Sequence, residues 1–174
     1  MERIAWFERK FNFDYTENIF PEIRQRLQGT PQRLSELTQS ISDEMLSARL
    51  DGKWSIKENI GHLSDLEPLW QKRLDDIKNG ATELSPADLS NTKTNEADHN
   101  SRSLRQLLDE FSRIRRQTLI MLDKIDEDVL FRSSLHPRLK KPMRTIDLFL
   151  FVAEHDDHHL ETISILTKRL LTKA

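Results

Sequence analysis

Apolar residues recur every three or four positions over most of the chain, a spacing that gathers them on one face of an α-helix. Gly29 interrupts the first such run, because glycine is typical of a helix end and Thr30-Pro31 of a new helix start. No stretch shows the strict alternation of a strand. The pattern predicts an all-α protein with helices over residues 17–28, 30–41, 55–79, 103–125 and 145–170.

Capping signals support several of these helix starts. Ser55 stands three residues before Glu58, and Ser103 three residues before Gln106. Each pair is a capping box, in which the two side chains bind free backbone N–H groups at a helix start. Thr145 is a suitable N-cap for the last helix.

The segments between the helices are polar, and the longest covers residues 80–102. Extended at about 3.3 Å per residue, such a linker reaches roughly 65 Å, so it could cross a whole bundle instead of turning back. Residues 1–16 are rich in aromatic side chains and would form an arm over one bundle end or a partner subunit. Together the amphipathic segments predict a single four-helix-bundle domain over residues 1–174.

Composition narrows the functional classes. The net charge of −2 gives no general attraction for nucleic acid or acidic lipid. The chain has no cysteine, so any metal must be bound through nitrogen or oxygen. No segment approaches ~18 consecutive apolar residues, and the start, MERIAWFERKFNF, lacks the apolar run of a signal peptide. We expect a cytoplasmic protein that binds neither nucleic acid nor membrane.

Histidines are concentrated in AEHDDHHLETI, residues 153–163, which holds three of the six in the chain. On a helix, His155 and His159 lie one turn apart on the same face. His62, in another predicted helix, shares an apolar stripe with Leu66 at i+4. Three imidazoles from two helices would then converge in the bundle interior.

Three neutral nitrogens leave a coordination position open, as in a catalytic rather than a structural zinc site. Imidazole also suits nickel, iron and copper, so the sequence does not select a metal. Nickel and zinc lead the candidates, with iron and manganese also open. Each part has a simpler interpretation when taken alone. His62 would be a hydrogen-bonded core histidine, and an H-x-x-x-H pair is common by chance.

Two charged residues near these histidines have alternative roles. Glu58 could orient His62 or approach the metal, although its capping-box role already explains it. Arg73 lies eleven residues after His62 and on nearly the same face. It is a candidate anchor for a substrate carboxylate or, alternatively, a surface ion-pair residue.

Other polar residues are expected at the surface. His158, Asp156 and Asp157 would face solvent, with a supporting role beside the metal site open for His158 or one aspartate. His99 and His136 lie in polar linkers, although the His136 loop could fold over a pocket. A basic loop patch, which would attract an anionic substrate if it lay near the site, consists of Arg138, Lys140, Lys141 and Arg144.

The sequence resembles the DinB-like superfamily, which includes YfiT-like proposed metal-dependent hydrolases and thiol S-transferases. The specific part is the combination of a W-S-x-K-E…G-H-L element with a late H-x-x-H-H element. The matching stretches are RLQGTPQRLSEL (26–37), DGKWSIKENIGHLSDLEPLW (51–70) and MRTIDLFLFVAEHDDHHLETI (143–163).

This resemblance implies a bundle whose helices run up-down-down-up, with residues 80–102 as the crossover. It also implies a divalent metal, often nickel or zinc, held by His62, His155 and His159. Family members with assigned activities use the metal to activate the thiol of a low-molecular-weight cofactor, such as bacillithiol, mycothiol or glutathione. Homodimers are frequent in the family, so a homodimer is expected.

Two functional hypotheses follow. In the first, the chain is an enzyme that activates a low-molecular-weight thiol or water at the three-histidine site, for S-transfer to or hydrolysis of a small-molecule substrate. No catalytic base can be named from the sequence. In the alternative, the bundle is a non-catalytic dimeric binding or stress-response module, whose metal joins two helices or is absent.

Overall fold

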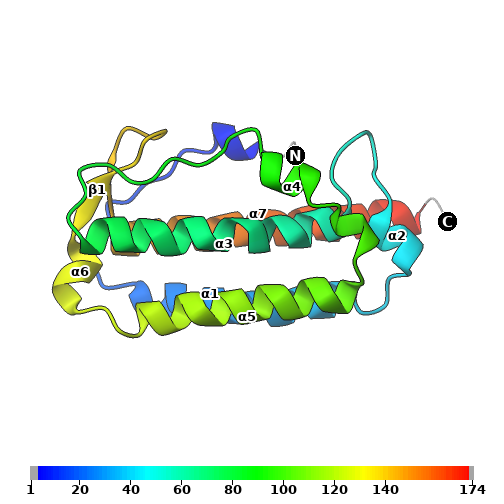
Figure 1. Cartoon of the computed structure of the whole chain (residues 1–174), viewed down its shortest axis with the longest axis horizontal. Coiled ribbons are helices and arrows are strands. Elements are labelled where there is room, and N and C mark those ends of the chain that lie inside the picture. The colour runs from blue at the N-terminus through cyan, green and yellow to red at the C-terminus, as the bar shows by residue number, and fades with distance from the viewer. Residues whose placement is uncertain (1–3, 173–174) are drawn as a thin grey trace.

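Four long helices form the body of the protein, a computed structural model that describes residues 4–172 (Figure 1). These helices are α1 (Phe20–Thr38), α3 (Ile56–Lys78), α5 (Leu104–Leu122) and α7 (Thr145–Leu171). The shorter elements are η1 (Trp6–Glu8), α2 (Asp43–Ser47), α4 (Thr92–Glu96), η2 (His99–Ser101), α6 (Glu127–Phe131), β1 (Ser133–Leu135) and β2 (Pro142–Arg144).

The long helices run up-down-down-up. In Figure 1, α3 and α5 run in one direction and α1 and α7 in the other. Hydrogen bonds agree, because Glu67 and Gln71 of α3 bind Arg115 and Thr118 of α5 in the same order along both helices. The predicted all-α bundle and its course are therefore confirmed.

Local sequence signals account for most of the helix starts. Both capping boxes are formed, by Ser55 with Glu58 and by Ser103 with Gln106. At α7 the N-cap is Arg144 instead of the expected Thr145, which is the first helical residue. Arg144 can take this position because its side chain and backbone both bind Asp147 in the first turn.

The expected break in the first helix is wrong, since α1 continues through Gly29 and Pro31. Proline has no N–H, so it leaves the carbonyl four residues earlier, that of Leu27, without its helical donor. Arg115 of α5 supplies one, with Nη1 3.1 Å from that carbonyl oxygen. A contact from another helix therefore replaces the missing helical bond.

The segment between α3 and α5 crosses the bundle from one end to the other (Figure 1), as its length allowed. It is more ordered than expected, because it contains α4 and η2. The loop over residues 132–144 also differs from expectation, because β1 and β2 pair in it as an antiparallel ladder. Strands of three residues are too short to show an alternating pattern.

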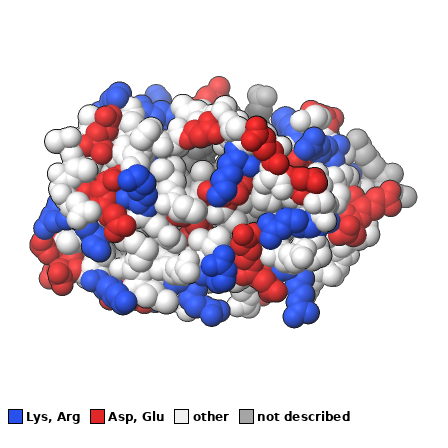
Figure 2. Space-filling model, in the orientation of Figure 1, with Lys and Arg blue, Asp and Glu red and all other residues white. Residues whose placement is uncertain are grey.

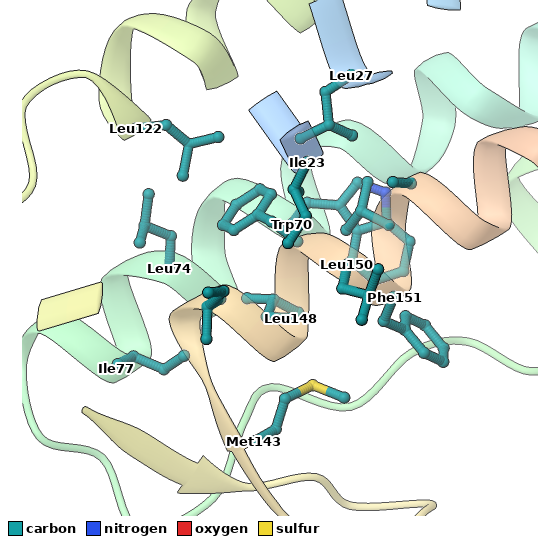
Figure 3. Packing of buried hydrophobic residues seen from close by; sticks show 14 of the residues in the cluster. Ile23, Leu27, Trp70, Leu74, Ile77, Leu122, Met143, Leu148, Leu150 and Phe151 are labelled. Carbon is teal, nitrogen blue, oxygen red and sulfur yellow. The ribbon is translucent and has the colours of Figure 1, made fainter. Parts of the chain in front are cut away.

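Two apolar clusters fill the bundle, one toward each end. One contains Trp70 and Leu74 of α3 with Phe151 of α7. In Figure 3, Trp70 and Leu74 lie toward Ile23 and Leu122, whereas Phe151 projects from the other side of α7. The other contains Ile60 of α3 and Ile163 of α7. Along every long helix, the residues of the two clusters are separated by a short gap.

A buried ionic layer occupies this gap. Arg115 of α5 lies 2.6 Å from Glu67 of α3 and 2.6 Å from Asp156 of α7, and these three side chains are at most 1% exposed. Thr30 of α1 donates to Asp156 at 2.7 Å. The expectation that Asp156 faces solvent is wrong, because this helix face meets Arg115. Its neighbour Asp157 keeps partial solvent contact, as expected.

The outer surface carries mixed charges. Figure 2 shows acidic and basic side chains interspersed over one face of the molecule, as the net charge of −2 predicts. Within residues 4–172, no helix combines the length and apolarity that a bilayer crossing requires.

Candidate metal centre

Three histidine side chains meet where α3 lies against α7. His62 comes from α3, and His155 and His159 lie one turn apart on α7. A ring nitrogen of each lies within 4.8 Å of those of the other two, and all three residues are buried. The helices therefore bring together the three imidazoles that the sequence singled out.

Hydrogen bonds fix which ring nitrogen of His62 carries the proton. Its Nδ1 lies 2.9 Å from Thr94 Oγ1, and that hydroxyl donates its one proton to Asp65 Oδ2 at 2.9 Å. Since Thr94 must then accept from the ring, Nδ1 of His62 is the donor. Nε2 of His62 keeps a free lone pair.

A hydrogen bond with Asn59 likewise fixes which ring nitrogen of His159 carries the proton. The side-chain oxygen of Asn59 lies 2.8 Å from His159 Nδ1, while its amide nitrogen donates to the Ser55 carbonyl at 2.8 Å. Because an amide oxygen only accepts, Nδ1 of His159 carries the proton and Nε2 is the atom with the lone pair. This Nε2 lies 3.2 Å from Nε2 of His155.

The surroundings of His155 fit a cation. Its Nδ1 is buried and has no hydrogen-bond partner among the described residues. A ring proton placed between Nε2 of His155 and Nε2 of His159 can satisfy their close contact, with Nδ1 of His155 then an acceptor without a partner. A cation bound by these imidazoles would satisfy both Nε2 lone pairs instead, with the ring proton of His155 on Nδ1, which has no described partner in either arrangement.

The charge state of the cluster also suits metal binding. Burial lowers the pKa of His62 to about 4, with Asp65 acting against the shift. Burial, assisted by the neighbouring His62, lowers the pKa of His155 well below its ordinary value. Both rings are therefore neutral at pH 7, the form in which imidazole binds metals. Three such nitrogens suit zinc, nickel, iron or copper.

Asp65 joins this cluster to the crossover segment. Its Oδ2 accepts from Thr94 and, at 2.8 Å, from His99 Nε2. Burial acts to raise the pKa of Asp65, but the hydrogen bonds from His99 and Thr94 outweigh it and hold that pKa below its ordinary value. His99 is 3% exposed, so its expected surface position is wrong. Its ring fits against α3 because Gly61 has no side chain there.

A cavity of about 380 Å³ opens beside the three histidines. The ring centroids of Trp54 and His62 are 4.6 Å apart, and those of Trp6 and His155 are 5.0 Å apart. The N-terminal arm therefore lies along α7 and forms part of the cavity wall, rather than covering a bundle end; residues 1–3 of the arm lie outside the described part. The other aromatic wall residues include Phe7, Trp70 and Phe151.

The other end of the cavity is polar and basic. Arg73 and His136 line it and are 1% and 3% exposed, so the surface positions considered for both are wrong. The His136 loop folds over the cavity, the alternative left open from the sequence. Of the basic patch, Arg138 lines the cavity, whereas Lys140 points to Glu83 at 3.3 Å.

The remaining candidates divide between the cavity and the helix start. His158 lines the cavity and is only partly buried, with its ring 5.4 Å from that of Trp6. Glu58 closes the capping box and accepts from Arg49 Nε at 2.9 Å, and it is not among the residues that line the cavity.

Sequence reasoning missed the residues that hold the histidine rings. Asn59 and Asp65 lie three residues before and after His62, so helical spacing could have found them on its face. Thr94 carries no local signal, because only the path of the crossover segment brings it to α3.

Comparison with known proteins supports both the fold and the family. The sequence profile of the DinB superfamily matches residues 26–163, well over half of the chain. A search of curated protein sequences finds no match.

Solved structures share the fold at low sequence identity. YfiT from Bacillus subtilis, described as a probable metal-dependent hydrolase with an unusual four-helix bundle topology, superposes with a TM-score of 0.79 at 20% identity over 93% of each chain. A Streptococcus pneumoniae protein gives 0.66 at 16% identity, over 88% of this chain and 93% of its own. A Clostridium difficile 630 protein gives 0.64 at 13% identity, over 91% and 98%.

These matches agree with the arrangement of the helices. The profile match begins inside α1 and ends inside α7, so it includes all of α3 and α5, the larger parts of α1 and α7, and all three clustered histidines. The resemblance noted in the sequence is confirmed, and the chain belongs to the DinB superfamily.

Proposed function

We propose that the protein is a metal-dependent enzyme whose single divalent ion is bound by His62, His155 and His159. The observation that carries the proposal is the set of hydrogen bonds around these rings. Thr94 and Asn59 hold Nδ1 protons on two of them, so that Nε2 carries the lone pair of each, and one ring nitrogen of each of the three histidines lies within 4.8 Å of the other two beside the cavity. Zinc and nickel are the metals that the family resemblance favours.

In this proposal the metal ion and the protein side chains have different roles. A divalent ion held there would supply Lewis-acid chemistry, which makes a water or a thiol a better nucleophile at neutral pH. The protein itself orients the ligand rings through Thr94 and Asn59, and such supporting hydrogen bonds fix ring orientation and raise ligand basicity. Trp6, Trp54 and Phe151 form an aromatic wall of the cavity, which would reduce the contact of the reacting groups with bulk water.

The nucleophile is water or a low-molecular-weight thiol. The chain has no cysteine, so a thiol must enter the cavity as part of a small molecule. The description of YfiT as a probable metal-dependent hydrolase supports hydrolysis as the reaction. The family resemblance supports S-transfer with a thiol cofactor equally well, and an assay of both reactions decides between them.

Metal analysis of the purified chain tests the binding step. The wild type should take up one nickel or zinc ion per chain after chelation and dialysis, and His62→Ala should lose most of this affinity. His158→Ala is the matched control, since His158 lines the same cavity but is not one of the three clustered histidines. Equal uptake by the wild type and His62→Ala would refute the site.

Activity assays test the enzyme proposal itself. Metal-loaded protein is offered ester and amide substrates, and separately bacillithiol, mycothiol or glutathione with an electrophile. Turnover that requires the metal and disappears in His62→Ala supports catalysis. Metal binding that raises the melting temperature without any turnover would instead favour the non-catalytic module, in which the ion joins α3 to α7.

A homodimer in the cytoplasm completes the proposal, on the strength of the family resemblance. Light scattering of the purified chain measures the first part. A mass near twice 20.5 kDa is the expected result.

A further inference from the structure

Arg73 is a buried cation without an anionic partner. Its side chain is 1% exposed, and no carboxylate of the described residues lies within ion-pairing distance of it. Its Nε donates to the Ser85 carbonyl at 2.8 Å. The nearby Asp76 accepts from the Ser85 backbone N–H and pairs with Lys72. The guanidinium lies 5.4 Å from the centre of the Trp70 ring, and Asp76 acts on it only at longer range, so an anion in direct contact would still stabilise this buried charge.

The neighbour of Arg73 is a second hydrogen-bond donor. His136 Nδ1 accepts from the backbone N–H groups of Arg138 and Leu139, at 3.2 and 3.1 Å. The ring proton of neutral His136 is therefore on Nε2, which lies 3.2 Å from Arg73 Nη1. Two N–H groups thus point at each other, and the arrangement lacks an acceptor.

The charges near this pair are the cation Arg138 and, on the Arg73 side, the carboxylate of Asp76, which is already bound to Ser85 and Lys72. Arg138 lines the same cavity, with its guanidinium 5.3 Å from the ring centre of Phe7. Burial lowers the pKa of Arg73 to about 10, with Asp76 acting against the shift and Arg138 adding to it. Burial, assisted by Arg73 and then Arg138, lowers the pKa of His136 to about 4. The acidic residue of the lining is Asp88, whose oxygens already accept from Ser90 and Thr92.

We propose that this end of the cavity binds the oxyanion head, a carboxylate or a phosphate, of an organic anion through Arg73, His136 and Arg138. The anion accepts from Arg73 and from Nε2 of His136, and it neutralises the buried charge. The remainder of the ligand is apolar, since Trp70 and Phe151 form the adjoining wall.

The inference rests on the proposed function in one respect, namely that the bound anion is the substrate. His62 and Arg73 are eleven residues apart on α3, which is about 16 Å along the helix axis. Both side chains extend into the same cavity, so the span left for the ligand is shorter. The substrate class is therefore an elongated organic acid whose reactive group is several bonds from its oxyanion.

Calorimetry with three probes tests the anion site on the full-length, metal-free chain. The probes are 4-phenylbutyrate, 3-phenylpropyl phosphate and the neutral 4-phenylbutan-1-ol. One or both anions should bind about tenfold or more tightly than the alcohol, the worth of a charge-assisted hydrogen bond. The stronger of the two anions identifies the head group. Equal binding of all three probes overturns the proposal.

Variants locate the site. Arg73→Gln should abolish the preference for anions, whereas the charge-matched control Arg105→Gln should keep it, since Arg105 is an exposed residue of α5. Should Arg73→Gln fail to fold, Arg138→Gln and His136→Gln serve instead, and each should weaken anion binding several-fold. Unchanged anion binding in these variants overturns the proposal.

Failure of this inference can be told apart from failure of the metal proposal. The metal-free chain and His62→Ala should both bind the anionic probe, because the oxyanion contacts are remote from the three histidines. Conversely, Arg73→Gln should take up metal like the wild type. Loss of the anion in His62→Ala with normal folding would contradict an independent oxyanion site.

Discussion

The absence of a side chain at Gly61 allows the crossover segment to lie against α3. A Cβ atom at this position would come within 2.4 Å of His99 ring atoms. We expect Gly61→Ala to displace His99 from Asp65 and to lower the free energy of unfolding by about 1–3 kcal/mol, the usual cost of overpacking. Urea unfolding monitored by circular dichroism measures the loss.

Gly29 provides the matched control for this substitution. It lies inside α1, and a Cβ there would meet nothing within 4 Å. Gly29→Ala should raise the free energy of unfolding by about 0.5–1 kcal/mol, because alanine loses less backbone entropy in a helix. A stabilising effect of Gly61→Ala, similar to that of Gly29→Ala, would contradict the close approach of His99.

At the scale of elements, the continuity of α1 depends on α5. Arg115 donates to the Leu27 carbonyl that Pro31 leaves free, and it also pairs with Glu67 and Asp156. We expect Arg115→Met to lower the free energy of unfolding by about 3–5 kcal/mol, since it leaves two buried carboxylates without their cation. Chemical denaturation measures this loss.

An exposed pair on the same helix supplies the comparison. Arg105 and Asp109 are 3.6 Å apart and largely exposed, so Arg105→Met should change stability by at most about 0.5 kcal/mol. Pro31→Ala restores an N–H for Leu27, and it should recover part of the Arg115→Met loss. Equal losses in the two arginine variants would refute the role of the buried layer.

The same elements show what the sequence could predict. Helical spacing is a local signal, so it placed His62, His155 and His159 on inward faces and identified the long helices. His99 and His136 were misplaced because their partners are remote in sequence. His99 meets Asp65 only through the crossover, and His136 meets Arg73 only through the folded loop before α7. No local pattern encodes such contacts.

At the scale of the whole molecule, the buried ionic layer and the histidine cluster lie at the same level of the bundle, between the two apolar clusters. Asp156 belongs to the ionic layer, and its neighbour His155 belongs to the cluster beside the cavity. The same helix, α7, therefore supplies Asp156 to the ionic layer and two of the three imidazoles to the cluster. We expect changes in the ionic layer to act on the candidate site through α7.

The burial of neutral histidines predicts that the metal-free chain becomes less stable as the pH falls. His62 and His136 have pKa values lowered from 6.5 to about 4, mainly by burial. Between pH 6.5 and about 4, these two histidines bind protons in the unfolded chain but not in the folded chain, so a falling pH favours unfolding. Each histidine contributes up to about 1.4 kcal/mol per pH unit. The urea concentration at the unfolding midpoint should therefore decrease as the pH is lowered from 7 to 5. His136→Gln should make this pH dependence weaker. A midpoint independent of pH would show that these histidines are not buried in the neutral form.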